Sequence, residues 1–344
     1  MKCAVFHGPK DLRIGEKPNP EISDHEALLR VKACSMCGTD LKIYENGHPR
    51  ITPPRILGHE IAGEVTNVGS SVQTLKTGDR VVLGPAIACG KCKWCALGLE
   101  NMCINRFSFS YEIDGGYSEY LRIPTEALET GLILKIRDDV TFEEASLTEP
   151  LSCVVHGHSL LKLRAEEKVV IFGGGPIGTM HTMLSKAAGA YVIASEVSAA
   201  RMSSLSKFGA DIVINAATED PVRRVLDLTS EEGVPAVIIA TANQEVQAQA
   251  LRLVAKKGRI LFFAGLPQGK SNVSLDLNLL HYRELMLIGS YATTYAHFAE
   301  ALELLQSREL PFKDLITRRL NLDRITDALE IVRNGSELKV TIAM

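Results

Sequence analysis

The sequence predicts an α/β protein that combines a β-rich part with a doubly wound, parallel sheet of six strands. Over the first ~150 residues, short β-prone segments are broken by Gly, Pro, Asp and Asn at close intervals, a pattern typical of an antiparallel barrel or sandwich. From about Leu163 onward, short apolar runs alternate with longer helical stretches. This alternation predicts a parallel sheet covered by helices on both faces.

Six apolar runs are the predicted strands of the parallel sheet, and they are almost continuously hydrophobic, as expected where both faces are buried. They lie at residues 169–173, 191–195, 211–215, 236–240, 259–265 and 285–289. Helical stretches that end in glycine, a common stop signal, separate the first five strands at residues 176–189, 198–209, 219–233 and 243–258. Nearer the C-terminus we expect helices at 297–307 and 323–333 and a final strand at 338–344.

Composition excludes several classes of partner. A formal net charge of -3 gives no electrostatic basis for binding nucleic acid or an anionic membrane. No apolar run approaches the ~20 residues of a membrane helix, and the N-terminal residues lack the apolar core of a signal peptide. We therefore expect a cytoplasmic protein with no nucleic-acid or membrane partner. Its 344 residues exceed what one core usually supports, so we expect two domains.

The most informative motif is a group of four cysteines, Cys89, Cys92, Cys95 and Cys103, spaced C-x2-C-x2-C-x7-C. Thiols this dense in a chain without a secretory signal are more typical of a metal site than of disulfides. Four sulfurs suit a closed tetrahedral zinc site, which leaves no position for substrate. An iron–sulfur cluster or redox-active thiols are the alternatives, but the bacterial cluster motif has a shorter last gap, followed by Cys-Pro. The motif therefore predicts a structural zinc ion.

A glycine-rich loop with the sequence GGGPIG follows the first strand of the parallel sheet, at residues 173–178. It is a G-x-G-x-x-G pattern in the strand–turn–helix context that makes it specific for dinucleotides. Gly173 permits the tight turn, Gly175 lets the backbone approach a pyrophosphate, and Gly178 lets helix and strand pack closely. We expect the free N–H groups of the helix N-terminus to bind the phosphates. Ile177 packs against the cofactor or belongs to the core.

The second strand of this sheet is followed by Glu196, eighteen residues after Gly178. A carboxylate at this place accepts hydrogen bonds from the ribose hydroxyls of NAD and repels the 2′-phosphate of NADP. Val197 and Ser198 follow, with no adjacent basic residue, so we expect NAD rather than NADP. The alternative is that Glu196 only caps the next helix, although Ser198 is itself a good cap.

Three short motifs outside the sheet carry further metal-ligand types: CGTD at 37–40, GHE at 58–60 and TEP at 148–150. Thiolate, imidazole and carboxylate are all zinc ligands, and a catalytic zinc takes three from the protein and keeps a fourth position open. Each motif alone is weak evidence, because a single Cys or His is more often a packing residue. We expect Pro150 to disfavour helical backbone at Glu149 and so to turn its carboxylate out of any preceding helix.

Together these motifs resemble the zinc-dependent medium-chain dehydrogenases/reductases, the alcohol and polyol dehydrogenase superfamily, and in particular its sorbitol dehydrogenase-like branch. The resemblance spans essentially the whole chain, since the three motifs above, the cysteine lobe, the glycine loop and the acid at 196 occur in the family's order. It implies a GroES-like catalytic domain at 1–147 with a zinc lobe at about 86–106. It also implies a Rossmann NAD-binding domain at 148–289 and a C-terminal segment, 290–344, that completes the catalytic domain.

The resemblance implies two zinc ions per subunit, one structural and one catalytic. Cys37 and His59 match the first two ligands of the catalytic zinc. The third would be Glu60, Glu149 or both, one directly and one through water. The glutamate at 149 resembles the polyol branch, because other alcohol dehydrogenases have a cysteine there. Asp40 matches a carboxylate that orients the ligating imidazole, or else it is a turn or cap residue.

Further matches concern the proton and the substrate. Thr39 matches a hydroxyl that relays the substrate's proton. Lys42 stands where other alcohol dehydrogenases have the next relay group, a histidine, and His48 is a weak substitute for it. Ile43 and the pair at 292–293 depart from the residues with which sorbitol dehydrogenases contact their polyol.

The resemblance also implies contacts to NAD and to other subunits. Residues Ala264, Gly265 and Leu266 match backbone contacts to the nicotinamide. Arg201 matches a basic residue near the adenosine, with a surface arginine as the alternative, and Pro176 belongs to the loop beside the cofactor. A homo-oligomer, a tetramer or a dimer, is implied through the sheet edge around residues 285–289.

The predicted reaction is therefore hydride transfer from a secondary alcohol to NAD, giving a ketone, with a polyol or sugar alcohol as the favoured substrate. L-threonine 3-dehydrogenase and simple secondary-alcohol dehydrogenase activities are the alternatives within the family. An NAD-binding sensor stabilised by zinc is the alternative from another class, but it has no need of the ligands at 37, 59 and 149. A zinc-free quinone reductase would lack both these ligands and the four-cysteine lobe.

Overall fold

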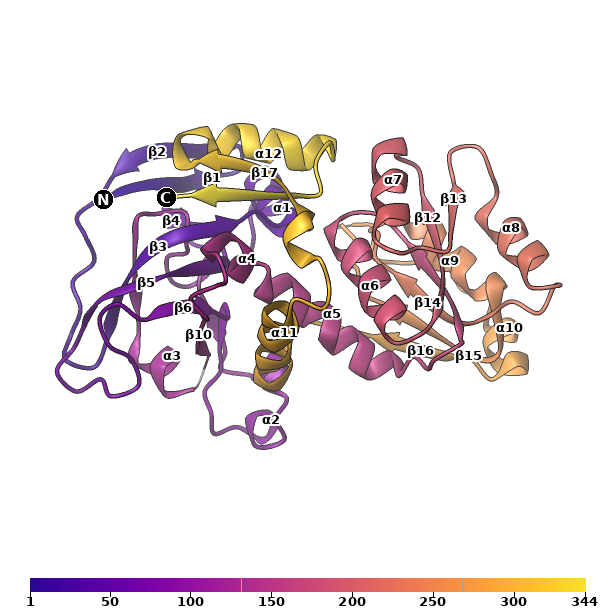
Figure 1. Cartoon of the computed structure of the whole chain (residues 1–344), viewed down its shortest axis with the longest axis horizontal. Helices are drawn as coiled ribbons and strands as arrows, with labels where there is room; N and C mark the ends of the chain where they lie inside the picture. The colour runs from indigo at the N-terminus through magenta and orange to yellow at the C-terminus, as the bar shows by residue number, and fades with distance from the viewer. Residues whose placement is uncertain (131, 268) are drawn as a thin grey trace. The chain divides into compact units, whose positions relative to one another are not determined.

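The computed structural model describes residues 1–130, 132–267 and 269–344. It contains two compact units, each described by itself below (Figure 1). Unit 1 comprises Met1–Ser152 and Thr293–Met344, and unit 2 comprises Cys153–Ala292. Among the described residues, we find no helix with the length and apolar character to cross a membrane.

Unit 1 is built on a sheet of seven strands with the order β10-β6-β5-β3-β18-β17, in which β9 also pairs with β3. Its strands are β3 (Ala27–Ser35), β5 (Glu60–Val68), β6 (Arg80–Leu83), β9 (Tyr120–Ile123), β10 (Ile133–Lys135), β17 (Ile316–Asn321) and β18 (Lys339–Ala343). Two smaller sheets contain β1 (Lys2–Gly8), β2 (Asp11–Glu16) and β4 (Arg55–Ile56), and β7 (Ala86–Ile87) and β8 (Phe107–Ser108).

Strand β3 joins the N-terminal and C-terminal parts of unit 1. Every second residue from Ala27 to Ala33 is fully buried, which is the alternation of a strand with one face on a core. β3 pairs antiparallel with β5 on one side and with β18 on the other, so Ser35 lies opposite Glu60 and opposite Thr341. The last strand of the chain thereby lies one strand away from β5, which carries Glu60, with β3 between them.

The helices of unit 1 are short and lie mostly in the connections between strands. They are α1 (Gly38–Asn46), α2 (Lys93–Ala96), α3 (Thr125–Glu129), α4 (Phe142–Ser146), α11 (Tyr295–Ser307) and α12 (Ile325–Asn334), with 3-10 turns η1 (Glu100–Met102), η2 (Phe312–Leu315) and η3 (Leu322–Arg324). The helix expected at 323–333 thus begins with a 3-10 turn. Helix α5 (Thr148–Leu161) begins in unit 1 and continues into unit 2.

Unit 2 is a six-stranded parallel sheet with the order β13-β12-β11-β14-β15-β16, the order of a doubly wound dinucleotide-binding fold. Its strands are β11 (Lys168–Phe172), β12 (Tyr191–Glu196), β13 (Ile212–Asn215), β14 (Val234–Ile239), β15 (Val254–Phe262) and β16 (Met286–Gly289). The helices that follow the strands are α6 (Pro176–Ala187), α7 (Ala199–Lys207), α8 (Pro221–Leu228), α9 (Gln244–Leu253) and α10 (Leu277–Arg283).

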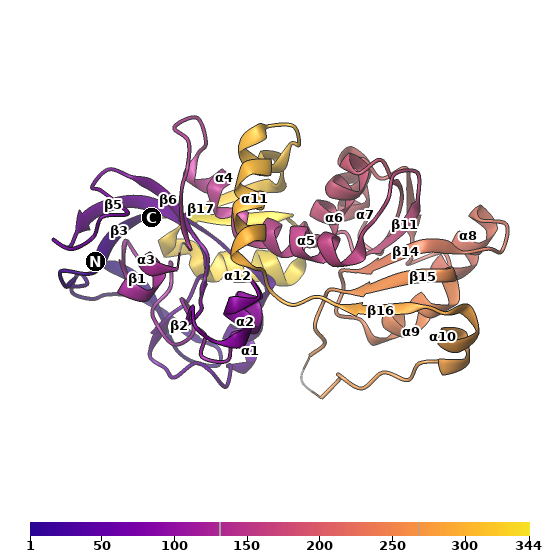
Figure 2. The same cartoon turned by 90° about the horizontal axis from the view of Figure 1, so that it is seen from below.

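Both faces of this sheet are buried, as the continuous apolar runs predict. Figure 2 shows α5 and α6 on one face and α9 and α10 on the other. Val169 and Ile171 of β11 pack on the first face, whereas Val170 and Phe172 pack on the second. The predicted α/β class, with a β-rich part and six parallel strands, is confirmed.

The helix expected at 243–258 is wrong at its C-terminal end, residues 254–258. α9 ends at Leu253 and β15 begins at Val254. Val234 pairs with Val254, but Ala236 pairs with Arg259, so the chain bulges between the two pairs and Lys257 takes a positive φ of 63°. Tertiary pairing with β14 therefore overrides the helical preference of these residues.

Candidate active site and metal centres

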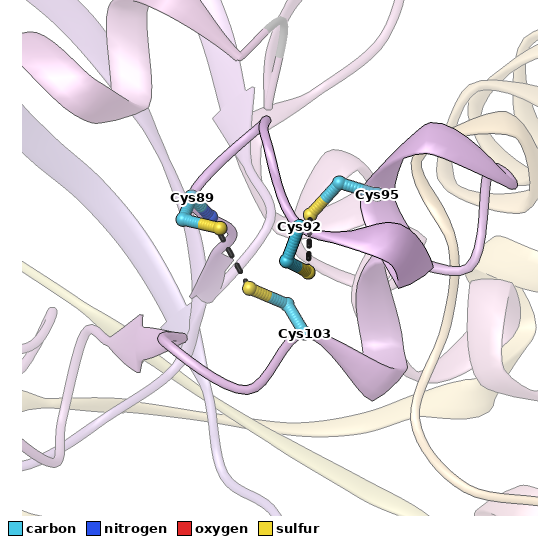
Figure 3. A group of neighbouring side chains, drawn as sticks. All are labelled: Cys89, Cys92, Cys95 and Cys103. Carbon is cyan, nitrogen blue, oxygen red and sulfur yellow. Dashed lines mark hydrogen bonds between the residues drawn. The ribbon is translucent and has the colours of Figure 1, made fainter.

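The four lobe cysteines converge from α2, η1 and the loops beside them (Figure 3). Their sulfur atoms all lie within 4.8 Å of one another, and Cys92 Sγ is 3.5 Å from Cys95 Sγ. Four sulfurs at ~2.3 Å from a tetrahedral zinc would be about 3.8 Å apart, so the arrangement fits this ion. All eight cysteines of the chain are free thiols.

The acidities of the lobe thiols also fit a cation at their centre. A hydrogen bond from the Cys95 backbone is the main influence that lowers the pKa of Cys92 to about 6. Burial, together with the neighbouring thiols of Cys92 and Cys103, raises the pKa of Cys95 to about 12. Sulfurs that disfavour each other's ionisation become simultaneous ligands when a divalent cation compensates their charge.

A second group of ligand atoms comes from Cys37, His59 and Glu60, whose ligand atoms lie within 4.8 Å of one another. Cys37 is the N-cap of α1, and Glu60 is the first residue of β5. Gly58 allows His59 to take this place, because a Cβ atom at Gly58 would lie 2.8 Å from Cys34 Sγ and its φ is 93°. The described structure thus brings three of the expected ligands together.

Asp40 has both of the roles considered for it. Its Oδ1 is 3.3 Å from His59 Nδ1, which leaves His59 Nε2 to face a metal. Its Oδ2 accepts hydrogen bonds of 2.9 Å from the Cys37 backbone N–H, closing a capping box, and from the Tyr117 hydroxyl. Burial raises the pKa of Asp40, but His59 and these hydrogen bonds outweigh it, so the pKa is lowered. The carboxylate therefore stays ionised beside the imidazole.

Glu60 is fully buried and forms an ion pair with a lysine that sequence analysis did not single out. The Lys339 Nζ atom lies 2.6 Å from Glu60 Oε1 and 2.5 Å from Oε2, and its side chain is 4% exposed. Burial lowers the pKa of Lys339, but the charge of Glu60 outweighs it and the pKa is raised. The signal was present in the sequence, since Lys339 is a charged residue inside the apolar final strand.

Glu149 lies near this group but is not one of the three residues whose ligand atoms converge. The expectation that Pro150 would keep Glu149 out of a helix is wrong, because both residues are in the first turn of α5. Proline is tolerated there, since a backbone N–H in the first turn has no intrahelical partner. Burial is the main cause that raises the pKa of Glu149 to about 7, with His59 acting in the opposite direction.

The other residues of this region differ in their surroundings. Thr39 lies in the first turn of α1 and is partly exposed, and Lys42 on the same helix is exposed. Ile43 is 1% exposed and belongs to the core of unit 1. His48 accepts a hydrogen bond of 3.2 Å from the Arg50 backbone and packs edge-on against Tyr111.

The glycine loop of unit 2 has the geometry expected of a dinucleotide-binding turn. Gly173 has a φ of 101°, and a Cβ atom at Gly178 would lie 1.8 Å from Gly173 O, so both positions require glycine. Gly175 is the N-cap of α6, followed by Pro176, and a Cβ atom at Gly175 would meet nothing within 4 Å. Its open side leaves the backbone accessible to a pyrophosphate.

Glu196 reaches from β12 to this loop. Its Oε2 accepts a hydrogen bond of 2.6 Å from Gly174 N, and its Oε1 accepts bonds of 2.7 and 2.9 Å from the N–H groups of Val197 and Ser198. The carboxylate thus braces both the glycine loop and the turn before α7. Glu196 does not cap α7, because its bonds go to the N-cap residue Ser198 and to Val197 before it rather than to the first turn of the helix.

The remaining predicted cofactor residues lie around the carboxyl ends of the strands. Ala264, Gly265 and Leu266 follow β15, and Ala264 N donates to Ile239 O at 3.1 Å. Arg201 lies on α7, and its Nε is buried without a hydrogen-bond partner among the described residues. Ile177 is partly buried in the first turn of α6. In open α/β sheets this edge is where ligands bind.

Two family models match the chain: an alcohol dehydrogenase GroES-like domain at residues 23–131 and a zinc-binding dehydrogenase model at residues 176–307. The chain is 33% identical to a sorbitol dehydrogenase of Bacillus subtilis over 337 residues, which is 96% of this chain and 93% of the relative. It is 36% identical to an L-threonine 3-dehydrogenase of Pyrococcus furiosus over 354 residues, covering 100% of this chain and 97% of the relative.

Among solved structures, that of 2R,3R-butanediol dehydrogenase from Bacillus subtilis is similar, with a TM-score of 0.89 and 27% identity over 100% of this chain and 99% of that one. The chain matches these relatives over nearly their full length. The matched family models are those of a zinc-binding oxidoreductase that uses NAD or NADP. The resemblance inferred from the sequence motifs is therefore confirmed, and the chain belongs to the zinc-containing medium-chain alcohol dehydrogenase family.

Proposed function

We propose that the protein oxidises a secondary alcohol, with a polyol or sugar alcohol as the favoured class, to a ketone while it reduces NAD to NADH and releases a proton. The observation that carries this proposal is the convergence of Cys37, His59 and Glu60 into one buried ligand group. A sulfur, a nitrogen and an oxygen donor are a ligand set of catalytic zinc sites, which keep one position open.

Zinc fits these residues because two of their contacts suit its binding. Asp40 Oδ1 lies 3.3 Å from His59 Nδ1, a position that favours the tautomer in which Nε2 is the ligating atom. Glu60 offers a carboxylate oxygen within 4.8 Å of the ligand atoms of Cys37 and His59, and its ion pair with Lys339 holds the carboxylate in place. When bound, zinc acts as a Lewis acid that makes the substrate hydroxyl more acidic.

The protein's own groups then position the substrate and receive its proton. Thr39 Oγ1 is the proposed acceptor, because it lies two residues from Cys37 and is partly exposed, with no hydrogen-bond partner among the described residues. Lys42 is exposed on the same helix, so we propose that solvent takes the place of the histidine that continues this path in other alcohol dehydrogenases.

We propose NAD as the physiological cofactor, bound by the glycine loop through its free backbone N–H groups and by Glu196 through the ribose hydroxyls. The nicotinamide of the bound cofactor supplies the hydride acceptor. Glu196 supports NAD because three backbone N–H groups hold its carboxylate at the end of β12, where it would repel a 2′-phosphate. Arg201 is the nearby residue that would favour NADP.

The charges around the ligand group favour a polyol over threonine. L-threonine carries a carboxylate, which needs a cationic partner when it is bound in a buried site. Two cations of unit 1 that could serve as this partner are already paired: Lys339 with Glu60, and Arg50 with Glu112 through two bonds of 2.7 and 2.8 Å. A neutral substrate with several hydroxyl groups makes no such demand.

The test is to follow NADH absorbance with polyols, sugar alcohols, butane-2,3-diol, butan-2-ol and L-threonine as substrates, before and after chelation and readdition of Zn²⁺. We expect turnover of the polyhydroxylated substrates, its loss with chelator and its return with zinc. The Cys37→Ser variant should lose activity and one of two zinc equivalents, while Cys34→Ser, a buried thiol outside the ligand group, should keep both. Full activity in Cys37→Ser, or turnover of threonine alone, would contradict the proposal.

We also propose that the chain assembles into a homo-oligomer, with a tetramer favoured, through the edge of the unit 2 sheet. Strand β16 has a neighbour on one side only, and Met286 and Tyr282 near this edge are 50% and 75% exposed. Exposed apolar side chains beside an open strand edge are typical of a self-association surface. Sedimentation equilibrium of the wild type and of Met286→Lys tests this, since a monomeric wild type would refute it.

A further inference from the structure

We infer that Tyr111 is a substrate-anchoring residue whose hydroxyl binds a second hydroxyl group of the substrate, adjacent to the carbon that is oxidised. This inference rests on the proposed function and names one residue by which the site would prefer diols and polyols to simple alcohols. Tyr111 lies in the loop between β8 and β9, a segment that no metal ligand and no predicted site residue comes from.

The loop of Tyr111 is fastened directly to the chain that carries His59. Gly115 N donates to Ile56 O and Gly116 N donates to Gly58 O, both at 2.8 Å. A Cβ atom at Gly115 would lie 2.3 Å from Gly58 O, so the two backbones are in close contact. The position of Tyr111 is therefore fixed relative to the ligand group rather than set by a mobile surface loop.

Two neighbouring side chains contact the ring of Tyr111, and neither forms a hydrogen bond with its hydroxyl. The His48 ring packs edge-on against it with centroids 5.1 Å apart, and the Arg50 guanidinium lies 4.8 Å from its centroid. Arg50 is held in turn by two bonds to Glu112, which also accepts a bond of 2.9 Å from Ser108 N. A ring gripped in this way loses little further freedom on binding a ligand.

The side chain of Tyr111 lies near the candidate active site, because its loop is bonded to the backbone of Ile56 and Gly58, next to His59. Four residues of that site, His59, Asp40, Cys37 and Glu149, are the ionisable groups with the largest effect on its phenol. Burial is the main cause that raises the pKa of Tyr111 to about 12, so the hydroxyl stays protonated and can both donate and accept. It has no hydrogen-bond partner among the residues that the structure describes.

These facts fit a polar anchor better than a core tyrosine. Tyr117, six residues further on, shows the structural use of a phenol, because it is fully buried and donates to Asp40 at 2.9 Å. Tyr111 is only partly buried, and its hydroxyl has no such partner among the described residues. The Tyr111 hydroxyl is therefore free to form a hydrogen bond with a substrate hydroxyl next to the carbon that is oxidised.

The experiment compares butane-2,3-diol with butan-2-ol, which differ by the one hydroxyl group in question, in the zinc-loaded enzyme with NAD. In Tyr111→Phe we expect the ratio of kcat/KM for the diol to that for the mono-alcohol to fall about ten-fold, the effect of one hydrogen bond, mainly through KM. Tyr44→Phe is the matched control, because its hydroxyl bonds Lys10 O on the exposed surface, and it should leave the ratio unchanged. Calorimetric titration of the zinc-loaded enzyme with the diol should show a similar weakening of binding in Tyr111→Phe alone.

The outcomes separate this inference from the proposed function. If the wild type oxidises neither the diol nor any polyol, the proposed function fails. If the wild type oxidises them and Tyr111→Phe has the wild-type ratio and diol affinity, the proposed function stands and the role of Tyr111 is refuted. An equal fall for both alcohols with a lower thermal midpoint would also refute it, since it would show a structural role only.

Discussion

Acid should destabilise unit 2 through a buried pair of histidines. His158 of α5 stacks on His181 of α6 with ring centroids 5.1 Å apart, and His181 also contacts Phe263 edge-on at 4.7 Å. Both ring nitrogens of His181 and Nε2 of His158 are buried without hydrogen-bond partners among the described residues. Burial lowers the pKa of His158 from 6.5 to about 4 and that of His181 well below 6.5.

The sign and size of the effect follow from these values. The unfolded chain takes up a proton at His158 near pH 6.5, whereas the folded chain does so only near pH 4. The free energy of unfolding is therefore unaffected above pH 6.5 and falls as the pH drops from 6.5 to about 4, by up to ~1.4 kcal/mol per pH unit. Because the side chain as a whole is only half-buried, we expect a loss of about 2 kcal/mol at pH 4.5.

The assay must resolve unit 2, because zinc binding in unit 1 also depends on pH and the one tryptophan, Trp94, lies in the cysteine lobe. Urea unfolding at pH 7.5 and 4.5, read by pulsed hydrogen exchange and mass spectrometry of peptides from Cys153–Ala292, meets this need. His158→Gln should lose about 2 kcal/mol less than the wild type between the two pH values. His281→Gln, an exposed histidine of the same unit, should behave as the wild type. Equal acid losses in the wild type and His158→Gln would refute the reasoning.

Three further changes test the packing around the sites. Lys339→Ala should lower the free energy of unfolding by about 3 to 5 kcal/mol, because it leaves a buried carboxylate unpaired. Thermal unfolding should show a much smaller loss of stability in Lys339→Arg, which keeps the positive charge. Gly178→Ala should abolish NADH binding, measured by fluorescence titration, and destabilise unit 2, since its Cβ would lie 1.8 Å from a backbone oxygen. Gly175→Ala should fold normally and weaken only NADH binding. Normal NADH binding by Gly178→Ala would contradict the geometry. Cys95→Ser should lose one zinc equivalent and change the fluorescence of the adjacent Trp94, and an unchanged zinc content would remove Cys95 from the lobe site.

The fold was predictable where local pattern and tertiary structure agree. The six apolar runs of unit 2 could be recognised because parallel strands are buried on both faces and each is followed by a helix. The same logic failed at residues 254–258, where the helical stretch from Asn243 has no local stop signal before Gly258 and only pairing with β14 converts it to strand. Helix α10 (Leu277–Arg283) and strand β17 (Ile316–Asn321) were not anticipated, because the first is only seven residues long and the second has a largely polar sequence.

The types of ligand in the candidate site could be predicted from the sequence, but the residues that contact those ligands could not. Cysteine spacing and the glycine loop are local, so they could be found in the sequence. The partners of Glu60 and the surroundings of Tyr111 depend on contacts between segments that are distant in sequence, such as Lys339 with Glu60. The helical conformation of Glu149 depends on where α5 begins. A proline is tolerated in the first turn of a helix but breaks a helix in its interior, so Pro150 alone could not show which case applies.

The charges of the ligand group indicate which carboxyl group is left to change its protonation. A bound zinc ion and Lys339 would bring three positive charges, and the three negative charges of Cys37, Asp40 and Glu60 would balance them in a buried site. A further ionised carboxylate would be uncompensated there, and in the metal-free site burial already raises the pKa of Glu149 to about 7.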